Sequence, residues 1–478
     1  MIAAAIGKAR VGGMFWGAQP IDLPADRGGV DPWHMLGRSP PLAYDGNDEA
    51  GLLAAMAGHR PVWATAGRFA NTFADGLPDP LERLITAWLI DAVAYRDPYS
   101  GRPVAIEGAI EQLAFWRGAI DRNRGITVAT GMARWKRREV EAMLWGGTAL
   151  HFESRAGPAI ATAHRTGGAI ANWATRTPAG LADAARAADI TIYPVEDGFL
   201  RSAGLGSECH PPHSITLDRT GLHLDPATPC DLEDLIATAP DDPQLLGRAQ
   251  QLRRVIIAEG ISKYAAGSAN FDRPTEARRL VLVAGQVEND LSVRLGGAGI
   301  ESNLELIRRA RLAEPDAYLM FKPHPDVDRG HRPGKIADDI ALGHVDRVVR
   351  DIPMASLLDV VDAVHVLTSL TGFEALLRGC DVIVHGQPFY AGWGLTRDLA
   401  PPIPRRQAAR KITTDALVAA ILILYPRYLD PVTKLPCPPE ILTERLAANP
   451  VPRETTLTRV RRLQGRVRRA LGKLGGAS

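Results

Sequence analysis

The sequence has few cysteines and little net charge. Its four cysteines, Cys209, Cys230, Cys380 and Cys437, lie far apart and form no CxxC pair. This pattern argues against a disulfide framework and a zinc site, and it fits a reducing compartment. The formal net charge of +2 over 478 residues argues against a dedicated nucleic-acid-binding protein.

Long apolar runs are missing as well. No stretch of about 18 consecutive apolar residues occurs, so we expect no membrane-spanning helix. The N-terminal residues, MIAAAIGKARVGGMFWG, contain no sustained apolar segment, so we expect no signal peptide. These absences predict a cytoplasmic protein.

Several common nucleotide-binding and catalytic motifs do not occur. The sequence contains no GxGxxG, GxxxxGK[ST], HExxH or GxSxG pattern. Functions that depend on nicotinamide or ATP, or on a serine-hydrolase nucleophile, therefore lose their usual support.

An alternation of apolar strands and helices begins near Gly125. Short β-branched or apolar runs predict strands, and helices are expected between them; the strands are at 126–131, 149–152, 169–173, 190–195, 280–286, 318–325, 364–367 and 381–386. This pattern favours parallel sheets with helices on both faces. Two such series predict an α/β fold with two Rossmann-like lobes facing a cleft, plus a degenerate N-terminal segment and a helical C-terminus.

A weak internal repeat suggests the domain organisation. Tyr95–Pro98 (YRDP) resembles Tyr428–Pro431 (YLDP), and the segments upstream share a similar rhythm of helix, glycine and short strand. We interpret the N-terminus as the remnant of a duplicated first module. The predicted parts are the remnant (1–82), a helical connector (83–120), an N-terminal lobe (121–260), a C-terminal nucleotide-binding lobe (261–425) and C-terminal helices with a basic tail (426–478).

The first candidate site follows an apolar strand. Ile190–Val195 ends in Glu196 and Asp197, and Arg201 and Ser202 come next. A buried parallel strand presents such carboxylates at its C-terminal edge, where ligands bind. A simple ion pair at a loop is the structural alternative.

The second candidate site is the FKPHP stretch. Lys322 and His324 lie between prolines that restrict the backbone, and this pair suits a phosphate or another anion. A lone histidine is more often a structural polar residue, but the adjacent lysine favours binding.

The third candidate site is the TSLTGFEALLRG stretch. Ser369, Gly372 and Glu374 surround a helix start, where free N–H groups and the helix dipole favour anions. Ser369 as a simple helix cap is an equally good interpretation. Glu374 suits either the helix dipole or ribose hydroxyls, and Gln286 ends the 280–286 strand.

These stretches resemble the KpsC-type capsule polysaccharide β-Kdo transferases. The matching motifs are EDGFLRSAGLGS, SKY (262–264), GQVENDLS, KPHPDV, TSLTGFEALLRG and PFYAGWGLT, in order, over about 120–447. Members of that family are built from two consecutive modules, and this chain resembles one complete module, the second. The resemblance implies a GT-B-like fold, a CMP-Kdo donor, and transfer with retention of configuration onto a lipid-linked β-Kdo oligosaccharide in capsule biosynthesis.

The resemblance also implies roles for the candidate residues. Asp197 matches the family's proposed nucleophile, and Glu196 and Arg201 complete the catalytic group. The residues expected to bind the CMP-sugar are Lys322, His324, Ser369, Gly372, Glu374 and Gln286. We add as our own inference that Arg201 or Arg134 binds the donor carboxylate, with Lys136 and Ser202 as further donor or acceptor contacts.

No cofactor and no metal ion are expected. The one DxD pair, Asp326 and Asp328, is of a kind that can hold a divalent cation on a nucleotide diphosphate. A CMP-sugar has a single phosphate that Lys322 and His324 suffice to neutralise, so we interpret the pair as a solvated loop.

The C-terminal tail predicts a membrane partner. Thr455–Leu474 is rich in arginine, contains no acidic residue and has apolar residues along one helical face. We expect peripheral attachment to the inner face of the cytoplasmic membrane; a tail packed on the protein is the alternative. Capsule-assembly proteins are further candidate partners. A non-catalytic binding protein and a transferase for another nucleotide sugar remain the competing functions.

Overall fold

The computed structural model divides into two compact units, which are described separately. It describes residues 1–17, 31–38, 42–202, 209–239, 242–263, 271–407 and 412–448. The first unit comprises Met1–Val128, Leu144–His151 and Thr162–Ala169; the second comprises Ala129–Met143, Phe152–Ala161 and the chain from Ile170 onward. Within the described ranges, no helix is long and apolar enough to cross a membrane.

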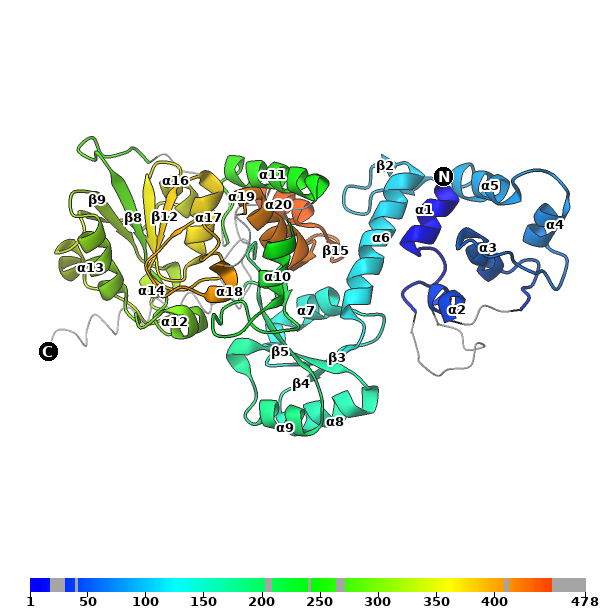
Figure 1. Ribbon diagram of the computed structural model, residues 1–478, viewed down its shortest axis with the longest axis horizontal. Helices are drawn as coiled ribbons and strands as arrows, with labels where there is room; N and C mark the ends of the chain where they lie inside the picture. Colours follow the sequence, from blue (N-terminus) through cyan, green and yellow to red (C-terminus); the bar gives the residue numbers. More distant parts are fainter. Residues whose placement is uncertain are drawn as a thin grey trace. The chain divides into compact units, whose positions relative to one another are not determined.

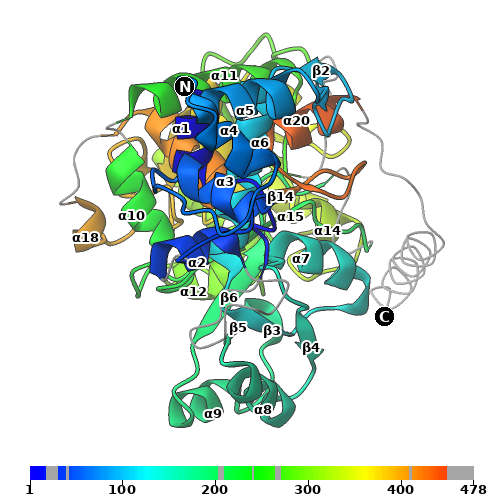
Figure 2. The ribbon, with the colours of Figure 1, turned by 90° about the vertical axis from the view of Figure 1, so that its right-hand side faces the viewer.

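The first unit is mainly helical (Figure 1). Its longest helix is α6 (Ile106–Asn123), which confirms the helix expected there. The other elements are α1 (Ile2–Ala9), α2 (Pro32–Arg38), α3 (Glu49–Met56), α4 (Arg68–Ala74), α5 (Pro80–Ile85), a π-helical turn (Thr86–Ile90), and the antiparallel strands β1 (Tyr95–Arg96) and β2 (Pro103–Val104). Helix α1 packs beside α3, α5 and α6 (Figure 2). The origin of residues 1–82 as a module remnant stays a prediction.

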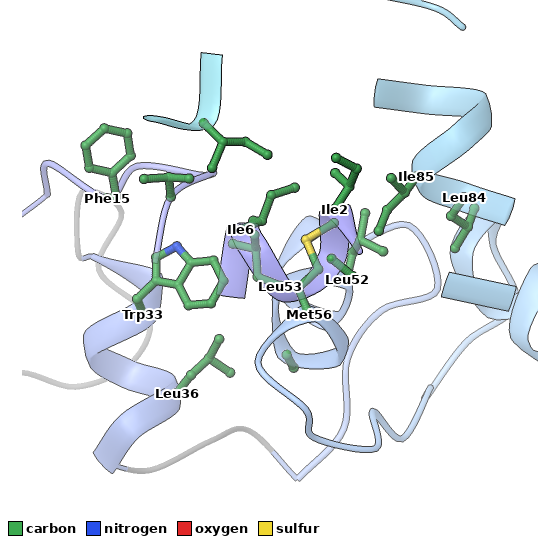
Figure 3. Packing of buried hydrophobic residues seen from close by; sticks show 14 of the residues in the cluster. Ile2, Ile6, Phe15, Trp33, Leu36, Leu52, Leu53, Met56, Leu84 and Ile85 are labelled. Atoms are coloured by element: carbon green, nitrogen blue, oxygen red, sulfur yellow. The ribbon is translucent and has the colours of Figure 1, made fainter. Parts of the chain in front are cut away.

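An apolar core holds these helices together (Figure 3). Ile6, Trp33, Leu53 and Ile85 come from four different helices, and Ile110 of α6 belongs to the same cluster. Because all of these side chains are buried, their removal from water stabilises the unit. The described helices among residues 1–85 therefore share one core with α6.

This core can be tested at one position. Ile85 is fully buried, so Ile85→Ala is expected to lower the free energy of unfolding of this unit by about 2–5 kcal/mol, through the lost burial and the remaining cavity. The control is Ile90→Ala, because Ile90 is 45% exposed and should change that free energy by less than about 0.5 kcal/mol. Differential scanning calorimetry measures both. Equal shifts of the two variants would contradict this core assignment.

A seven-stranded mixed sheet, most of it in the second unit, forms what we call the first lobe. Its strand order is β15-β14-β7-β6-β5-β3-β4. The strands are β3 (Ile126–Thr130), β4 (His151–Glu153), β5 (Ala169–Trp173), β6 (Ile192–Asp197), β7 (Ser214–Leu217), β14 (Arg427–Leu429) and β15 (Pro436–Cys437). The accompanying helices are α7 (Arg137–Leu144), α8 (Ala156–Thr166), α9 (Leu181–Ala187), α10 (Asp231–Thr238) and α11 (Pro243–Ala258). The four strands predicted in this lobe are confirmed.

A six-stranded parallel sheet forms the second lobe, with the strand order β10-β9-β8-β11-β12-β13. The strands are β8 (Leu280–Ala284), β9 (Tyr318–Lys322), β10 (Arg347–Val348), β11 (Ala363–Val366), β12 (Asp381–Val384) and β13 (Arg397–Asp398). Every residue of β8 is buried, which explains its uninterrupted apolar sequence. Helix α13 (Asn303–Ala313) contacts β8 and β11, and α17 (Leu370–Arg378) contacts β11 and β12 (Figure 1).

The remaining helices connect these strands or follow them. They are α12 (Leu291–Gly296), α14 (Pro325–Asp328), α15 (Asp338–Leu342), α16 (Met354–Leu358), α18 (Pro404–Gln407), α19 (Thr414–Val418), the π-helical segment Ala419–Leu424 and α20 (Pro439–Ala448). Figure 1 shows helices on both faces of the parallel sheet. The predicted α/β fold with two Rossmann-like, GT-B-like lobes is therefore confirmed.

Two local predictions differ from the structure. The sequence SITLDRTGLHLD (214–225), with its Arg-Thr-Gly turn, predicts a hairpin. That prediction is wrong, because β7 pairs with β6 and β14 and no strand follows at 218–225. The segment from 426 onward was expected to be helical, yet β14 and β15 precede α20 and join the first lobe. Both differences arise because Arg427 and Tyr428 pair with Ile215 and Ser214, which are distant in sequence. The predicted basic tail lies outside the described residues.

Candidate active site

A cavity of about 880 Å³ lies in the second unit and is lined by both lobes. The first lobe contributes Glu196 and Asp197 from the end of β6. The second lobe contributes Lys322 and His324, at the end of β9 and just after it, and the start of α17. These side chains come together because parallel strands present their C-terminal ends at one edge of a sheet. The structure thus unites the three candidate stretches.

Asp197 is held by two cations. Its carboxylate lies 2.9 Å from Arg201 Nε and 3.3 Å from Lys136 Nζ, and its side chain is 23% exposed. Burial alone would raise the pKa of Asp197, but the charges of Arg201, Lys136 and Lys263 outweigh burial and hold this pKa well below its usual range. Asp197 is therefore an ionised carboxylate in a sheltered cavity.

Arg201 is committed to the protein itself. Its guanidinium is fully buried and, besides Asp197, donates to Ser202 Oγ at 2.7 Å and to the carbonyl of His210 at 2.9 Å. Neither Arg201 nor Ser202 lines the cavity. The structure therefore favours Arg201 as the group that orients Asp197 over the predicted contact with a donor carboxylate.

Lys136 is the predicted donor or acceptor contact that lies next to Asp197 in the cavity. Its Nζ lies 3.4 Å from the centre of a Trp173 ring, and the residue lines the cavity. Burial lowers the pKa of Lys136, although the neighbouring charge of Asp197 opposes this change. Arg134 is exposed and does not line the cavity. Of the predicted first-lobe cations, Lys136 is the one that lines the cavity.

Glu196 differs from its neighbour in charge state. Its Oε1 accepts a hydrogen bond from the backbone N–H of Thr175 at 3.2 Å. Burial, followed by the negative charge of Asp197, raises the pKa of Glu196 to about 8. Two adjacent carboxyl groups with opposite pKa shifts are a pattern that separates a nucleophile from a proton carrier.

Lys322 is largely occupied by backbone carbonyls. Its Nζ donates to the carbonyl of Arg350 at 2.8 Å and to that of Ile352 at 2.7 Å. An ammonium group has three N–H donors, so at most one remains for a ligand. Burial lowers the pKa of Lys322 to about 8. Lys322 thus anchors the loop after β10, and its predicted contact with a phosphate is untested.

His324 caps the short helix α14. Its Nδ1 accepts from the backbone N–H of Asp326 at 3.1 Å. A neutral imidazole that accepts at Nδ1 carries its proton on Nε2. Burial lowers the pKa of His324, which favours this neutral form. His324 is therefore suited to donate one hydrogen bond to an anion as an uncharged group.

Ser369 and Gln286 build the loop before α17. Ser369 caps the helix by accepting from the N–H of Thr371 at 3.2 Å. The Gln286 side chain accepts from the N–H of Thr368 at 2.7 Å and donates to its hydroxyl at 2.9 Å. Both residues line the cavity. Their polar atoms shape the start of α17, where Ser369, Leu370 and Thr371 line the cavity.

Gly372 has a packing role in the structure. A Cβ at this position would overlap the hydroxyl group of Tyr390, which donates to the carbonyl of Ser369. Gly372 does not line the cavity. The glycine therefore allows a close helix contact, and direct donor binding by Gly372 has no support in its position.

Sequence reasoning missed Lys263. In the sequence Lys263 stands out only as part of the SKY motif (262–264), but in the structure it lines the cavity. Its backbone N–H donates to Glu374 Oε1 at 2.9 Å, and Glu374 is 8% exposed. Because α17 begins at Leu370, Glu374 lies beyond the first turn, so it does not serve the helix dipole as expected. Its position in the loop between the two predicted lobes was the sequence feature that could have indicated a place in the cavity.

Comparisons with known proteins point to one family. The model of the capsule polysaccharide biosynthesis protein family matches residues 168–270 and 249–428. The chain is 37% identical over 357 residues to the capsule polysaccharide modification protein LipA of Neisseria meningitidis, which covers 74% of this chain and 50% of LipA. It is 42% identical over 274 residues to the lipopolysaccharide-processing protein LpsZ of Rhizobium meliloti, covering 55% of this chain and 61% of LpsZ. The chain thus spans about half the length of LipA.

Two solved structures of KpsC from Thermosulfurimonas dismutans have a similar fold. The first is named a β-Kdo 2,4 transferase; it matches with a TM-score of 0.58 and 30% identity and covers 68% of this chain and 98% of its own. The second is named a β-Kdo 2,7 transferase; it matches with a TM-score of 0.55 and 28% identity over 68% of this chain and 99% of its own. Both matches extend over nearly the whole length of the matched KpsC structures.

Proposed function

Because this chain belongs to the capsule polysaccharide biosynthesis protein family, we propose that it is a glycosyltransferase that moves Kdo from CMP-Kdo onto a β-Kdo oligosaccharide. The proposed transfer retains the anomeric configuration. The observation that carries the proposal is the ionised Asp197 in a cavity that also contains His324 and the start of α17. Similarity to nearly the whole length of a structure named a β-Kdo transferase supports it.

In the first step Asp197 acts as the nucleophile. Its Oδ forms a bond to the anomeric carbon while the bond from that carbon to the phosphate oxygen breaks, and the electron pair leaves with CMP. Carboxylates also stabilise the oxocarbenium-like transition state. Arg201 and Lys136 keep Asp197 ionised and oriented. No proton moves in this step, because CMP leaves as an anion.

In the second step Glu196 acts as the base. The acceptor hydroxyl attacks the anomeric carbon, the bond to Asp197 breaks with its electron pair, and the hydroxyl proton passes to Glu196. The charge of Asp197 helps to raise the pKa of Glu196 in the free enzyme. That charge is absent while Asp197 is esterified, so the pKa of Glu196 falls and the carboxyl group releases its proton to solvent. Glu196 is then ionised when the acceptor hydroxyl needs a base.

This role predicts a separation of the two steps. Glu196→Gln is expected to slow transfer to the acceptor by about 10²- to 10⁴-fold, because the amide accepts no proton. The first step needs no base, so the variant should still release a burst of one equivalent of CMP. Rapid-quench measurements over pH 5–9 record both steps; the acceptor step should rise with pH in the parent and be flat in the variant. A variant without a burst, or with normal turnover, would contradict the assignment.

The rest of the cavity suits the donor's nucleotide and carboxylate. His324 and the start of α17 line the part of the cavity that we assign to the phosphate, and Lys136 is placed for the carboxylate beside the anomeric carbon. We expect no cofactor and no metal ion: Asp328 pairs with Arg350 at 3.0 Å, and among the described residues no group of three His, Cys, Asp or Glu side chains is arranged for a metal. The single phosphate of a CMP-sugar needs only a few hydrogen-bond donors from the protein.

The acceptor is proposed to be lipid-linked. The basic tail lies outside the described residues, so its predicted contact with an anionic membrane surface stays a prediction. A contact with capsule-assembly proteins stays a prediction as well.

Donor screening tests the proposed function. The full chain is incubated with a synthetic Kdo-primed lipid acceptor and CMP-Kdo, CMP-sialic acid or UDP-sugars, and nucleotide release and product linkage are recorded. We expect release of CMP from CMP-Kdo alone and a product with a retained configuration. Turnover of another donor instead, or none with any donor, would overturn the proposal.

A further inference from the structure

Lys263 lies where the chain passes from the first lobe to the second. It follows α11, and the next strand along the chain is β8 of the second lobe. Its backbone N–H donates to Glu374 Oε1 at 2.9 Å, and its carbonyl accepts from the backbone N–H of Arg201 at 3.3 Å. One residue therefore contacts both the loop after β6 and helix α17.

These contacts place Lys263 between the two parts of the site. Arg201, which binds the Lys263 carbonyl through its backbone, holds Asp197 through its guanidinium at 2.9 Å. Glu374, on the other side, belongs to the helix whose N-terminus lines the cavity. Because a buried carboxylate is costly without hydrogen bonds, the contact of Glu374 with Lys263 constrains the backbone strongly.

The charge of Lys263 acts on both sides of the cavity. It lowers the pKa of Asp197 and opposes the raised pKa of Glu196 in the first lobe, and it contributes to the lowered pKa of His324 in the second. Lys263 itself lines the cavity together with these groups. In the proposed reaction, the bond between the anomeric carbon and the phosphate oxygen breaks between Asp197 and His324. The charge of Lys263 acts on both of these residues.

Lys322, the lysine first expected at the phosphate, has two N–H groups directed to backbone carbonyls. We propose that Lys263 is a catalytic residue whose ammonium group binds the phosphate of the leaving nucleotide, with Glu374 as the positioning residue that holds it. This proposal rests on the proposed transfer from a nucleotide sugar.

The chemistry explains why a cation belongs at this place. When the bond between the anomeric carbon and the phosphate oxygen breaks, its electron pair stays on that oxygen, and the phosphate group gains one negative charge. A fixed ammonium group binds this product-like phosphate more strongly than the donor's phosphodiester. Lys263 then supplies the stabilisation that a metal ion gives to nucleotide diphosphates in other transferases.

Calorimetry tests the contact with three probes: CMP, its methyl phosphodiester (CMP with one methylated phosphate oxygen), and cytidine. The methyl phosphodiester is called the ester below. The parent is expected to bind CMP more tightly than the ester. Lys263→Met should weaken CMP binding roughly 10- to 100-fold, the usual range for a charge-assisted contact, and leave cytidine binding unchanged. Lys263→Arg should restore most of the loss. Lys335→Met is the matched control, because Lys335 is exposed and does not line the cavity.

The result also separates this inference from the proposed function. If the parent does not bind CMP, the proposed function fails. If the parent binds CMP and Lys263→Met binds CMP and its ester with parent affinities, Lys263 does not contact the phosphate and this inference alone is overturned.

A second measurement tests the positioning role of Glu374. Glu374→Ala removes the acceptor of the Lys263 N–H and should slow the single-turnover release of CMP, whereas Glu374→Gln, which retains a carbonyl oxygen, should cause a smaller loss. Combining Glu374→Ala with Lys263→Met should add little to Lys263→Met alone. Fully additive losses would show that Glu374 acts independently of Lys263.

Discussion

Asp197→Asn is expected to lower the rate of sugar transfer by at least about three orders of magnitude, since an amide does not replace a carboxylate nucleophile. Binding of CMP should stay close to that of the parent, because the proposed nucleotide contacts, Lys263, His324 and the start of α17, do not include Asp197. The carbonyl oxygen of the substituted amide can still accept from Arg201, which limits the change in folding. Turnover and CMP affinity are measured on the same folded sample.

Mass spectrometry gives direct evidence on the nucleophile. A Kdo adduct is expected on the peptide that contains residue 197 when Glu196→Gln is incubated with CMP-Kdo, because that variant forms the intermediate and resolves it slowly. Asp183→Asn is the control for the loss of a carboxylate, since Asp183 is 84% exposed and pairs with Arg186 on the surface of α9. Robust turnover by Asp197→Ala would refute the assignment.

Glu233→Ala is expected to lower the free energy of unfolding of the second unit by about 3–5 kcal/mol, because it leaves a buried guanidinium without its partner. Glu233 accepts from Arg406 Nε at 2.7 Å and from Arg405 Nε at 2.6 Å. The Arg406 side chain is 1% exposed and also donates to the carbonyls of Pro388 and Ala391. Glu233 therefore links α10 to the segment that carries Phe389 of the cavity wall.

Urea unfolding measures this effect. The control is Glu440→Ala, whose partner Arg248 is 44% exposed; such pairs contribute less than about 1 kcal/mol. Glu233→Gln should cost less than Glu233→Ala, because it keeps an acceptor for Arg406. Similar small losses in Glu233→Ala and Glu440→Ala would show that the buried pair is not important for stability.

Eight strands of the two lobes, β3–β6, β8, β9, β11 and β12, were predictable from local sequence. An apolar run such as LVLVA in β8 has one stable place, a sheet covered on both faces. The polar residues that end such strands, among them Asp197 and His324, then lie at the same edge. Pairing between distant segments was not predictable: β14 joins β7 although more than 200 residues separate the two strands, and no local pattern specifies that partner.

The tertiary structure reassigned several polar side chains within the site. Arg201, Lys322 and Gln286 looked like ligand-binding groups, yet each of them donates hydrogen bonds to groups of the protein itself. Whether a lysine or arginine is available to a substrate depends on which carbonyls and carboxylates the fold brings next to it. Those partners are mostly distant in sequence, so the residue type alone does not show the difference.

The sequence by itself determined the fold class, the family and the three stretches that meet at the cavity, because strand patterns and motif spacing are local properties of the chain. Only the tertiary structure decided which groups in those stretches face the cavity. It also separated the pKa values of Glu196 and Asp197 and brought Lys263 to the cavity that they share with His324. Burial and charge–charge distance control these properties, and both exist only after the lobes have packed.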